Sequence, residues 1–203
     1  MLFSSILLGL PLISGVAAGP ITGADSGTLV SRALTTDQQS ALDAHNVVRA
    51  TIWDKGTLPR PPTSKTKIPI PPLVWDDQLE AGALKWAQTL ATSGKLVHSG
   101  TFGLGETIER ISDSAAGTDF LTQATKIWIA KKKDFSPVEG NLFNPAAGLY
   151  IHPFTQTVWR DTKRVGMAWA NATVVTGEGK TVTNWYIVAQ YYPAGNFMMQ
   201  KIF

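Results

Sequence analysis

The chain of 203 residues contains no cysteine. This absence excludes a thiol nucleophile and a cysteine-ligated metal, and it leaves no residue that could form a disulfide bond. A domain without disulfides depends on its hydrophobic core, and a chain of this length can bury enough apolar surface to fold without crosslinks. Hydrophobic residues account for 44% of the chain, which is sufficient for one well-buried globular domain.

Charged residues are also few. They make up only 16% of the chain, and the formal net charge is a modest +3, so the composition is not that of a disordered protein. The one dense basic run, at residues 131–133, is short, and no basic stripe with interleaved aromatic residues is present. The composition therefore gives no indication of nucleic-acid binding, and it mildly favours an acidic partner such as anionic lipid or a cell wall.

Long unbroken hydrophobic runs are missing as well. The opening MLFSSILLGLPLISGVAAGP is apolar, but Pro11 and Gly15 interrupt it and small residues follow. This pattern is typical of a signal peptide over residues 1–18, with a membrane anchor as the alternative. Residues 19–35 are small and polar, which predicts a flexible leader. We therefore expect a secreted, extracellular protein without a transmembrane anchor.

The tripeptide Asn171-Ala172-Thr173 is an N-glycosylation sequon. A chain secreted by a eukaryote can carry a glycan at such a position. The sequon therefore predicts a glycoprotein that is modified at Asn171.

The globular domain is expected to span residues 36–203. Thr36 can cap a helix, with Gln39 three residues later as its capping-box partner. One face of this segment carries Leu42, His45, Val48 and Ile52. This spacing predicts an amphipathic helix in which His45 is a hydrogen-bonded core histidine. Residues 56–72 then carry six prolines, which predicts an extended surface loop that could also serve as a contact arm.

Three further helices are predicted. The second begins at Asp77, which caps it together with Glu80, and ends at Gly94. The third spans roughly residues 119–134. The fourth is short, covers about residues 153–162 and has a proline in its first turn.

Two strands close the chain. The stretches RVGMAWANATVV and TNWYIVAQYYP are typical of strands, and TGEGK between them is the expected hairpin turn. A loop punctuated by glycines holds His98 and Glu106. Helices that cover an antiparallel strand pair predict an α+β domain.

Several blocks of this sequence resemble motifs of the CAP superfamily, which comprises cysteine-rich secretory proteins, antigen 5 and pathogenesis-related 1 proteins. The blocks occur in the order of the family and extend over about residues 36–197. They are AHNVVRA, LVWDDQLEAGALKWA, VHS with GET, HPFTQTVWRDTKRVGMAWA, and YIVAQYYPAGN. The resemblance implies a three-layer α-β-α sandwich with a central antiparallel sheet. The missing cysteines and the secretory start suggest a fungal type by analogy.

The resemblance also implies a cleft in which two histidines and two glutamates meet and hold a divalent metal such as zinc in some members. Carried over by motif, these residues are His98, Glu106 and His152, and the second glutamate position holds Lys131. A protonated amine does not bind a metal and repels a divalent cation at short range. We therefore expect a weak or lost zinc site and an ion pair between Glu106 and Lys131. The alternative is a shifted helix, in which Asp134 supplies the carboxylate.

Further departures from the family concern its cysteines. Met167 and Ala189 stand where many members carry cysteine. No cysteine-rich extension is present either, so ion-channel regulation of the kind linked to such extensions is not expected.

Three classes of function follow from the resemblance. The first is extracellular binding of a sterol or fatty acid, with Tyr150 and Phe154 among the loop aromatics that could line the site. The second is a defence- or virulence-related interaction with a host protein or cell-wall partner, to which the arm at residues 56–72 could contribute. The third and least expected is hydrolysis, with Ser99 beside His98, because the sequence has no nucleophile elbow.

Overall fold

The structure is a computed structural model in which five stretches are described: residues 32–52, 70–112, 117–135, 143–144 and 151–203. The chain divides into two compact units, residues 1–33 and 34–203, and the elements described below belong to the second unit. The predicted signal peptide lies outside the described residues, as do most of the predicted leader and of the proline-rich loop.

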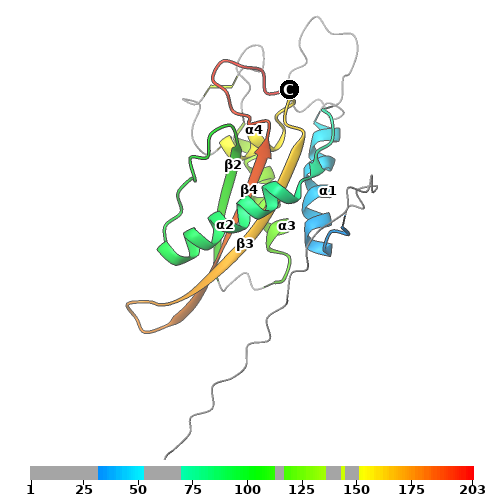
Figure 1. The fold of residues 1–203 in the computed structure, drawn as a ribbon. Coiled ribbons are helices and arrows are strands. Elements are labelled where there is room, and N and C mark those ends of the chain that lie inside the picture. The colour runs from blue at the N-terminus through cyan, green and yellow to red at the C-terminus, as the bar shows by residue number, and fades with distance from the viewer. Residues whose placement is uncertain (1–31, 53–69, 113–116, 136–142, 145–150) are drawn as a thin grey trace, which may run out of the picture. The chain divides into compact units, whose positions relative to one another are not determined.

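The second unit contains helices and strands in a mixed order (Figure 1). They are α1 (Thr36–Thr51), β1 (Val74–Trp75), α2 (Asp77–Ser93), β2 (Gly105–Ser112), α3 (Phe120–Ala130), the 3₁₀ helix η2 (Lys131–Asp134), α4 (His152–Thr157), β3 (Arg164–Val175) and β4 (Thr181–Tyr192). This composition confirms the predicted α+β class. In the described residues, no helix is both long and apolar enough to cross a membrane.

The four strands form one sheet in the order β1-β3-β4-β2. β3 and β4 pair antiparallel along their whole length, and the predicted TGEGK stretch connects them. β2 also pairs antiparallel with β4, whereas the two-residue β1 is parallel to β3. The predicted strand pair is therefore confirmed, but β1 and β2 were not predicted as strands.

Helices cover both faces of the sheet, as a three-layer sandwich requires. On one face α2 packs Ala83, Ala87 and Leu90 against Tyr186 and Val188 of β4. On the other face α1 and α3 pack against the sheet; the cluster there includes Ala41, Leu121, Trp128, Met167, Ile187 and Ala189. Because side chains alternate along a strand, β2, β3 and β4 each contribute to both clusters.

Glycine at position 166 allows α2 to lie close to the sheet. A Cβ atom at Gly166 would collide with backbone atoms of Asp76, Leu79 and Glu80 at the start of α2. The first turn of α2 therefore lies directly against β3.

Met167 and Ala189, the two positions at which the family resemblance implies cysteine, lie directly opposite each other in the β3–β4 register. Both side chains are fully buried. The Met167 thioether accepts a weak hydrogen bond from Thr125 Oγ1 at 3.8 Å, and Thr125 belongs to α3. Packing against α3 therefore occupies the space at this cross-strand position.

The helix boundaries differ from prediction by small amounts. The cap of α1 is Thr35, which forms a capping box with Gln38, and not Thr36 with Gln39. Both pairs have the spacing of a capping box, so the sequence does not distinguish them. The cap of α2 is Asp76, one residue before the predicted Asp77.

The predicted third and fourth helices are both shorter than expected. α3 ends at Ala130, and Lys131–Asp134 continue it as the tighter helix η2. α4 ends at Thr157, well before residue 162, because the chain turns there to enter β3.

Candidate functional site

A pair of polar side chains, His98 and Glu106, lies at the start of β2. Glu106 is the second residue of β2, and His98 belongs to the segment that follows α2. Their Nδ1 and Oε1 atoms are 2.8 Å apart, and the backbone N–H of Ser99 donates to the same Oε1 at 2.9 Å. Glu106 is 8% exposed and His98 is 64% exposed, so the pair connects the interior to the surface.

The environment of Glu106 favours the ionised carboxylate. Burial alone would raise its pKa, but the hydrogen bonds from His98 and Ser99 outweigh burial and hold the pKa below its usual value. The second carboxylate oxygen, Oε2, is buried and has no hydrogen-bond partner among the described residues. Glu106 can therefore accept one more donor.

Glu106 borders a hollow of about 220 Å³. Its lining comes from residues 98–101, 104–106, Gln156, Gly195 and Asn196. Gln156 fixes one wall, because it donates to Thr162 Oγ1 at 3.1 Å and accepts from the Gly195 N–H at 2.9 Å. A Cβ atom at position 105 or 195 would collide with Gln156, which explains the glycines there.

His152 belongs to a different set of contacts. It is the first residue of α4, and its ring packs against Phe143 with centroids 5.0 Å apart. Its backbone carbonyl accepts a hydrogen bond from Asn196 Nδ2 at 2.9 Å. Asn196 also lines the hollow beside Glu106, so His152 is joined to that hollow through its backbone.

The structure does not assemble the metal site that the family resemblance implied. Across the described residues, no three histidine, aspartate or glutamate side chains are close enough together to hold a metal ion. Protein zinc sites use three or four ligands, whereas His98 and Glu106 supply two. The residues present therefore do not fit zinc in this arrangement, and the set His98, Glu106 and His152 stays a prediction.

The expected ion pair between Glu106 and Lys131 is absent from the described structure, where Glu106 bonds to His98 instead. Alternation along β2 places Glu106 and Glu109 on opposite faces of the sheet. The charge of Lys131 acts on Glu109: burial raises the pKa of that carboxyl, and Lys131 offsets part of the rise. Asp134, the alternative carboxylate, is exposed in η2.

Ser99 and Phe154, considered for hydrolysis and for lipid binding, make contacts that do not suit those roles. Ser99 Oγ is 3.0 Å from Thr101 Oγ1 and accepts from the Thr101 N–H, so it is not paired with His98 as a nucleophile with its base. Phe154 is fully buried and packs against Phe135, so it offers no exposed surface to a lipid. Tyr150 lies outside the described residues.

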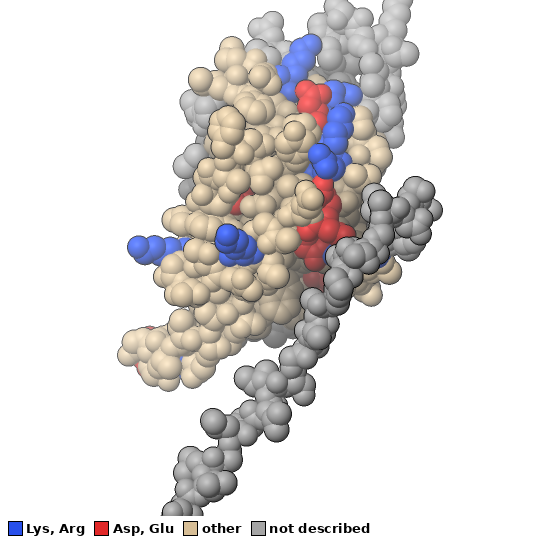
Figure 2. Space-filling model, in the orientation of Figure 1, with Lys and Arg blue, Asp and Glu red and all other residues tan. Residues whose placement is uncertain are grey.

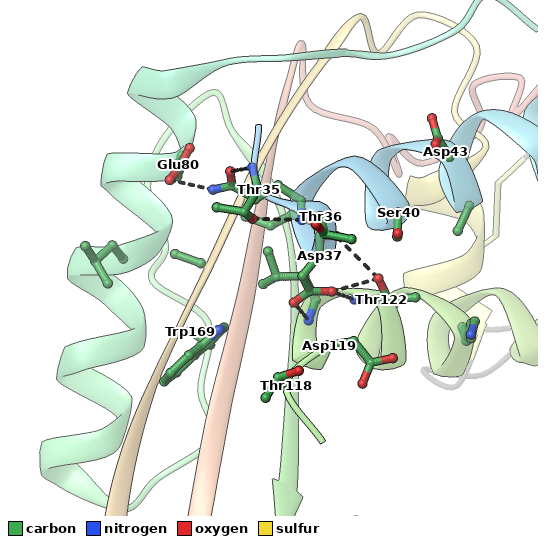
Figure 3. A pocket seen from close by; sticks show the side chains of 17 residues that line it. Thr35, Thr36, Asp37, Ser40, Asp43, Glu80, Thr118, Asp119, Thr122 and Trp169 are labelled. Atoms are coloured by element: carbon green, nitrogen blue, oxygen red, sulfur yellow. Dashed lines mark hydrogen bonds between the residues drawn. The ribbon is translucent and has the colours of Figure 1, made fainter. Parts of the chain in front are cut away.

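A second and larger depression, a groove of about 970 Å³, was not predicted from the sequence (Figure 3). α1, α2, α3 and β3 all contribute to it. Its apolar lining consists of Ala44, Leu84, Leu121, Met167, Ala168 and Trp169. Its charged lining consists of Asp37, Asp43, Glu80 and Asp119 with one cation, Lys126.

Two of the groove carboxylates hold the surrounding helices together. Asp37 accepts hydrogen bonds from the backbone N–H groups of Leu121 and Thr122 and from the Thr122 hydroxyl, as Figure 3 shows in part. It thereby caps α3 from α1, and the residue at the N-cap position of α3 makes no side-chain cap itself. Glu80 of α2 accepts from the side chains of Gln38 and Trp75 at 2.8 and 2.7 Å.

The predicted glycosylation site, Asn171, lies in β3 opposite Trp185 of β4. Its side chain is exposed. Modification there stays a prediction.

Comparisons with known proteins agree with this architecture. The model of the cysteine-rich secretory protein family, CAP, matches residues 42–195. A pathogenesis-related protein of PR-1 type from Sambucus nigra is 31% identical over 166 residues, which cover 80% of each chain. Pathogenesis-related protein 1 from Arabidopsis thaliana is 28% identical over 200 residues, covering 98% of this chain and 96% of that one.

Solved structures of similar fold include NaASP2 with Zn²⁺ and BmVAL-1. The first has a TM-score of 0.60 and 24% identity, and covers 83% of this chain and 86% of its own. The second has a TM-score of 0.62 and 21% identity, with coverages of 87% and 86%. These structures share the fold, and the family model and the plant relatives extend the likeness to the sequence. Although it lacks cysteine, the chain belongs to the cysteine-rich secretory protein family, CAP.

Proposed function

We propose that this chain is a secreted CAP-domain protein that binds a neutral, rigid lipid such as a sterol in the groove between α1, α2, α3 and β3. The observation that carries the proposal is the apolar floor of that groove, where Leu84 and Trp169 are 41% and 38% exposed. Small-molecule sites are concave and combine apolar surface with polar groups that fix orientation, and the groove offers both, with six apolar and eleven polar or charged lining residues.

The negative charge of the groove favours a sterol over a fatty acid as its ligand. Its carboxylates outnumber its single lysine, so a fatty acid would bring its own negative charge into a negative field. A sterol carries no charge, and its hydroxyl can donate to a carboxylate at the rim. The balance of charge therefore favours a sterol over a fatty acid.

The test is equilibrium binding of a labelled sterol to the purified protein, with a fatty acid as competitor. Trp169→Ser removes exposed aromatic surface from the groove and is expected to weaken sterol binding roughly tenfold or more. Phe102→Ser is the matched control, because Phe102 is exposed but does not line the groove. Thermal unfolding of the Trp169 variant is measured alongside, because Trp169 also packs edge-on against Phe120.

A second variant tests the role of charge. Asp43 is exposed and accepts a hydrogen bond from Gln39, so Asp43→Lys should leave the fold intact. We expect sterol affinity to stay unchanged and fatty-acid affinity to rise. Sterol affinity that is unchanged by Trp169→Ser would refute the groove as the binding site. The absence of any saturable sterol binding would refute the proposed function.

The secretory part of the proposal has its own test. The family is described as secretory, and the sequence of residues 1–18 supports export. Expression in a eukaryotic host should release a protein whose N-terminus follows residue 18. The secreted Asn171→Gln variant should be lighter than the secreted wild type by the mass of one glycan. A secreted wild type with the mass of the bare polypeptide would contradict the glycosylation prediction.

A further inference from the structure

Phe102 is held away from the protein on an ordered turn. Its relative exposure is 102%, so its side chain is fully exposed to solvent. Gly100 and Gly103 on either side have φ values of +68° and +80°, and the Leu104 N–H donates to the Thr101 carbonyl at 3.3 Å. The turn therefore presents an aromatic side chain to the surroundings.

A second segment near the C-terminus also exposes apolar side chains. Phe197, Met198 and Met199 are 48%, 68% and 66% exposed. The Met199 N–H donates to the Phe143 carbonyl at 3.0 Å, and the Phe143 N–H donates to the Gln200 carbonyl at 2.8 Å. Met199 has a φ of +60°, which is uncommon for a bulky residue, so hydrogen bonding fixes this segment in an unfavoured shape.

These two segments border the same hollow. Residues 98–101 and 104–106 line it on one side, and Gly195 and Asn196 line it on the other. The two groups of exposed apolar side chains therefore flank one depression. Figure 1 shows both segments, in green and red, and Figure 2 shows mostly uncharged surface on that side of the molecule.

The charge pattern around these segments suits the surface of an anionic membrane. Residues 96–105 and 181–200 contain no aspartate, glutamate, lysine or arginine. Each run is bounded by an exposed lysine, Lys95 before the first and Lys201 after the second. Apolar side chains that enter the membrane interface, with lysines at headgroup level, have this arrangement. Anionic headgroups complement the lysines.

We propose that the protein docks on the surface of an anionic lipid bilayer through Phe102, Phe197, Met198 and Met199, which we call the docking surface. Its aromatic and methionine side chains enter the interface, and Lys95 and Lys201 contact the headgroups. This inference is independent of the groove and holds whether or not a sterol binds there.

Vesicle co-sedimentation tests the docking surface. The protein is purified as it is released after expression, and its N-terminus is determined, because an uncleaved apolar start would bind vesicles by itself. Wild type should bind vesicles of phosphatidylcholine and phosphatidylserine, and added salt should weaken this binding. Phe102→Ser should weaken it roughly tenfold or more, and Lys95→Gln or Lys201→Gln roughly fivefold each.

Matched controls separate docking from general stickiness. Val175→Ser removes an apolar side chain that is 70% exposed at the end of β3, and Lys180→Gln removes an exposed charge in the hairpin turn. Both should bind like wild type. Equal losses of vesicle affinity in the control variants and the docking variants would overturn the proposal. The proposal would also fail if the wild-type protein did not bind these vesicles. The protein could instead self-associate without binding vesicles, and Phe102→Ser could abolish that self-association. This result would assign the docking surface to contact with a second copy of the chain.

Discussion

His45 should make the stability of this protein depend on pH. Its side chain is fully buried in α1. Its Nδ1 lies 2.8 Å from the Ala41 carbonyl, which can only accept, so Nδ1 carries the proton. Its Nε2 lies 3.0 Å from the Tyr191 hydroxyl, and burial raises the pKa of Tyr191 well above its ordinary value. Tyr191 therefore stays protonated and donates to Nε2, and the neutral imidazole uses both of its nitrogens.

A proton on Nε2 would break this arrangement inside the core. Burial, together with the nearby charge of Arg49, lowers the pKa of His45 from 6.5 to about 4 in the folded protein. In the unfolded chain the pKa returns to about 6.5, so the unfolded state binds more protons between these values. Stability should therefore fall as the pH drops from about 6.5 to about 4. The loss amounts to about 3 kcal/mol, at about 1.4 kcal/mol per pH unit.

The measurement is urea unfolding of wild type and His45→Gln at intervals between pH 7.5 and 4. Carboxyl groups such as Glu109, whose pKa is raised by burial, also contribute to the pH dependence, so the difference between the two proteins isolates His45. The variant should be less stable than wild type at pH 7.5, and this gap should shrink by about 3 kcal/mol towards pH 4. A gap that stays constant within 0.5 kcal/mol, roughly the scatter of such measurements, would refute the reasoning.

Three further predictions concern stability, and all can be measured by urea unfolding. Arg49 is fully buried and donates to four backbone carbonyls, so Arg49→Met should cost about 3 kcal/mol or more because those acceptors lose their donor; a loss below about 1 kcal/mol would contradict this. Gly166→Ala should cost about 2 kcal/mol because its Cβ meets the backbone of α2, whereas Gly177→Ala, with open space around it, should be near neutral. Asp37→Ala should cost about 1–2 kcal/mol through loss of the α3 cap, and the exposed Asp43→Ala should cost far less.

The helices and the final hairpin were predictable because their signals are local. The apolar spacing of α1 predicted a core histidine, and His45 is buried there. The TGEGK turn predicted the pairing of β3 with β4. Such patterns depend on neighbours within one or two turns of the chain, and the sequence contains all of that information.

The effect of Lys131 on Glu109 was not predictable because β2 was not predicted from the sequence as a strand. The segment GETIERIS follows several glycines and carries charges, so it resembled a loop, yet it forms β2. Without the two-residue period of a strand, the sequence could not show that Glu106 and Glu109 face opposite sides. The family resemblance pairs Lys131 with Glu106, whereas in the structure the charge of Lys131 acts on Glu109.

The groove could not be predicted from the sequence for a different reason. Its lining comes from four elements that are distant in the sequence, and Trp169 and Leu84 each belong to an ordinary amphipathic pattern. One signal was available: Asp37 in the first turn of α1 is an acidic residue without a role in its own helix cap. Its bonds to α3 bring the two helix starts together, but the sequence does not specify that partner.

The absence of cysteine and the burial of Met167 determine how this protein responds to redox conditions. Because the chain has no thiol, reductants and thiol oxidants cannot alter its covalent connectivity, and its folding needs no disulfide exchange. Oxidants instead act on methionine, and Met167 is buried whereas Met198 and Met199 are exposed. Conversion of the exposed pair to sulfoxides would make apolar side chains polar and leave the core unchanged. Oxidation would therefore alter the surface of this protein before its stability.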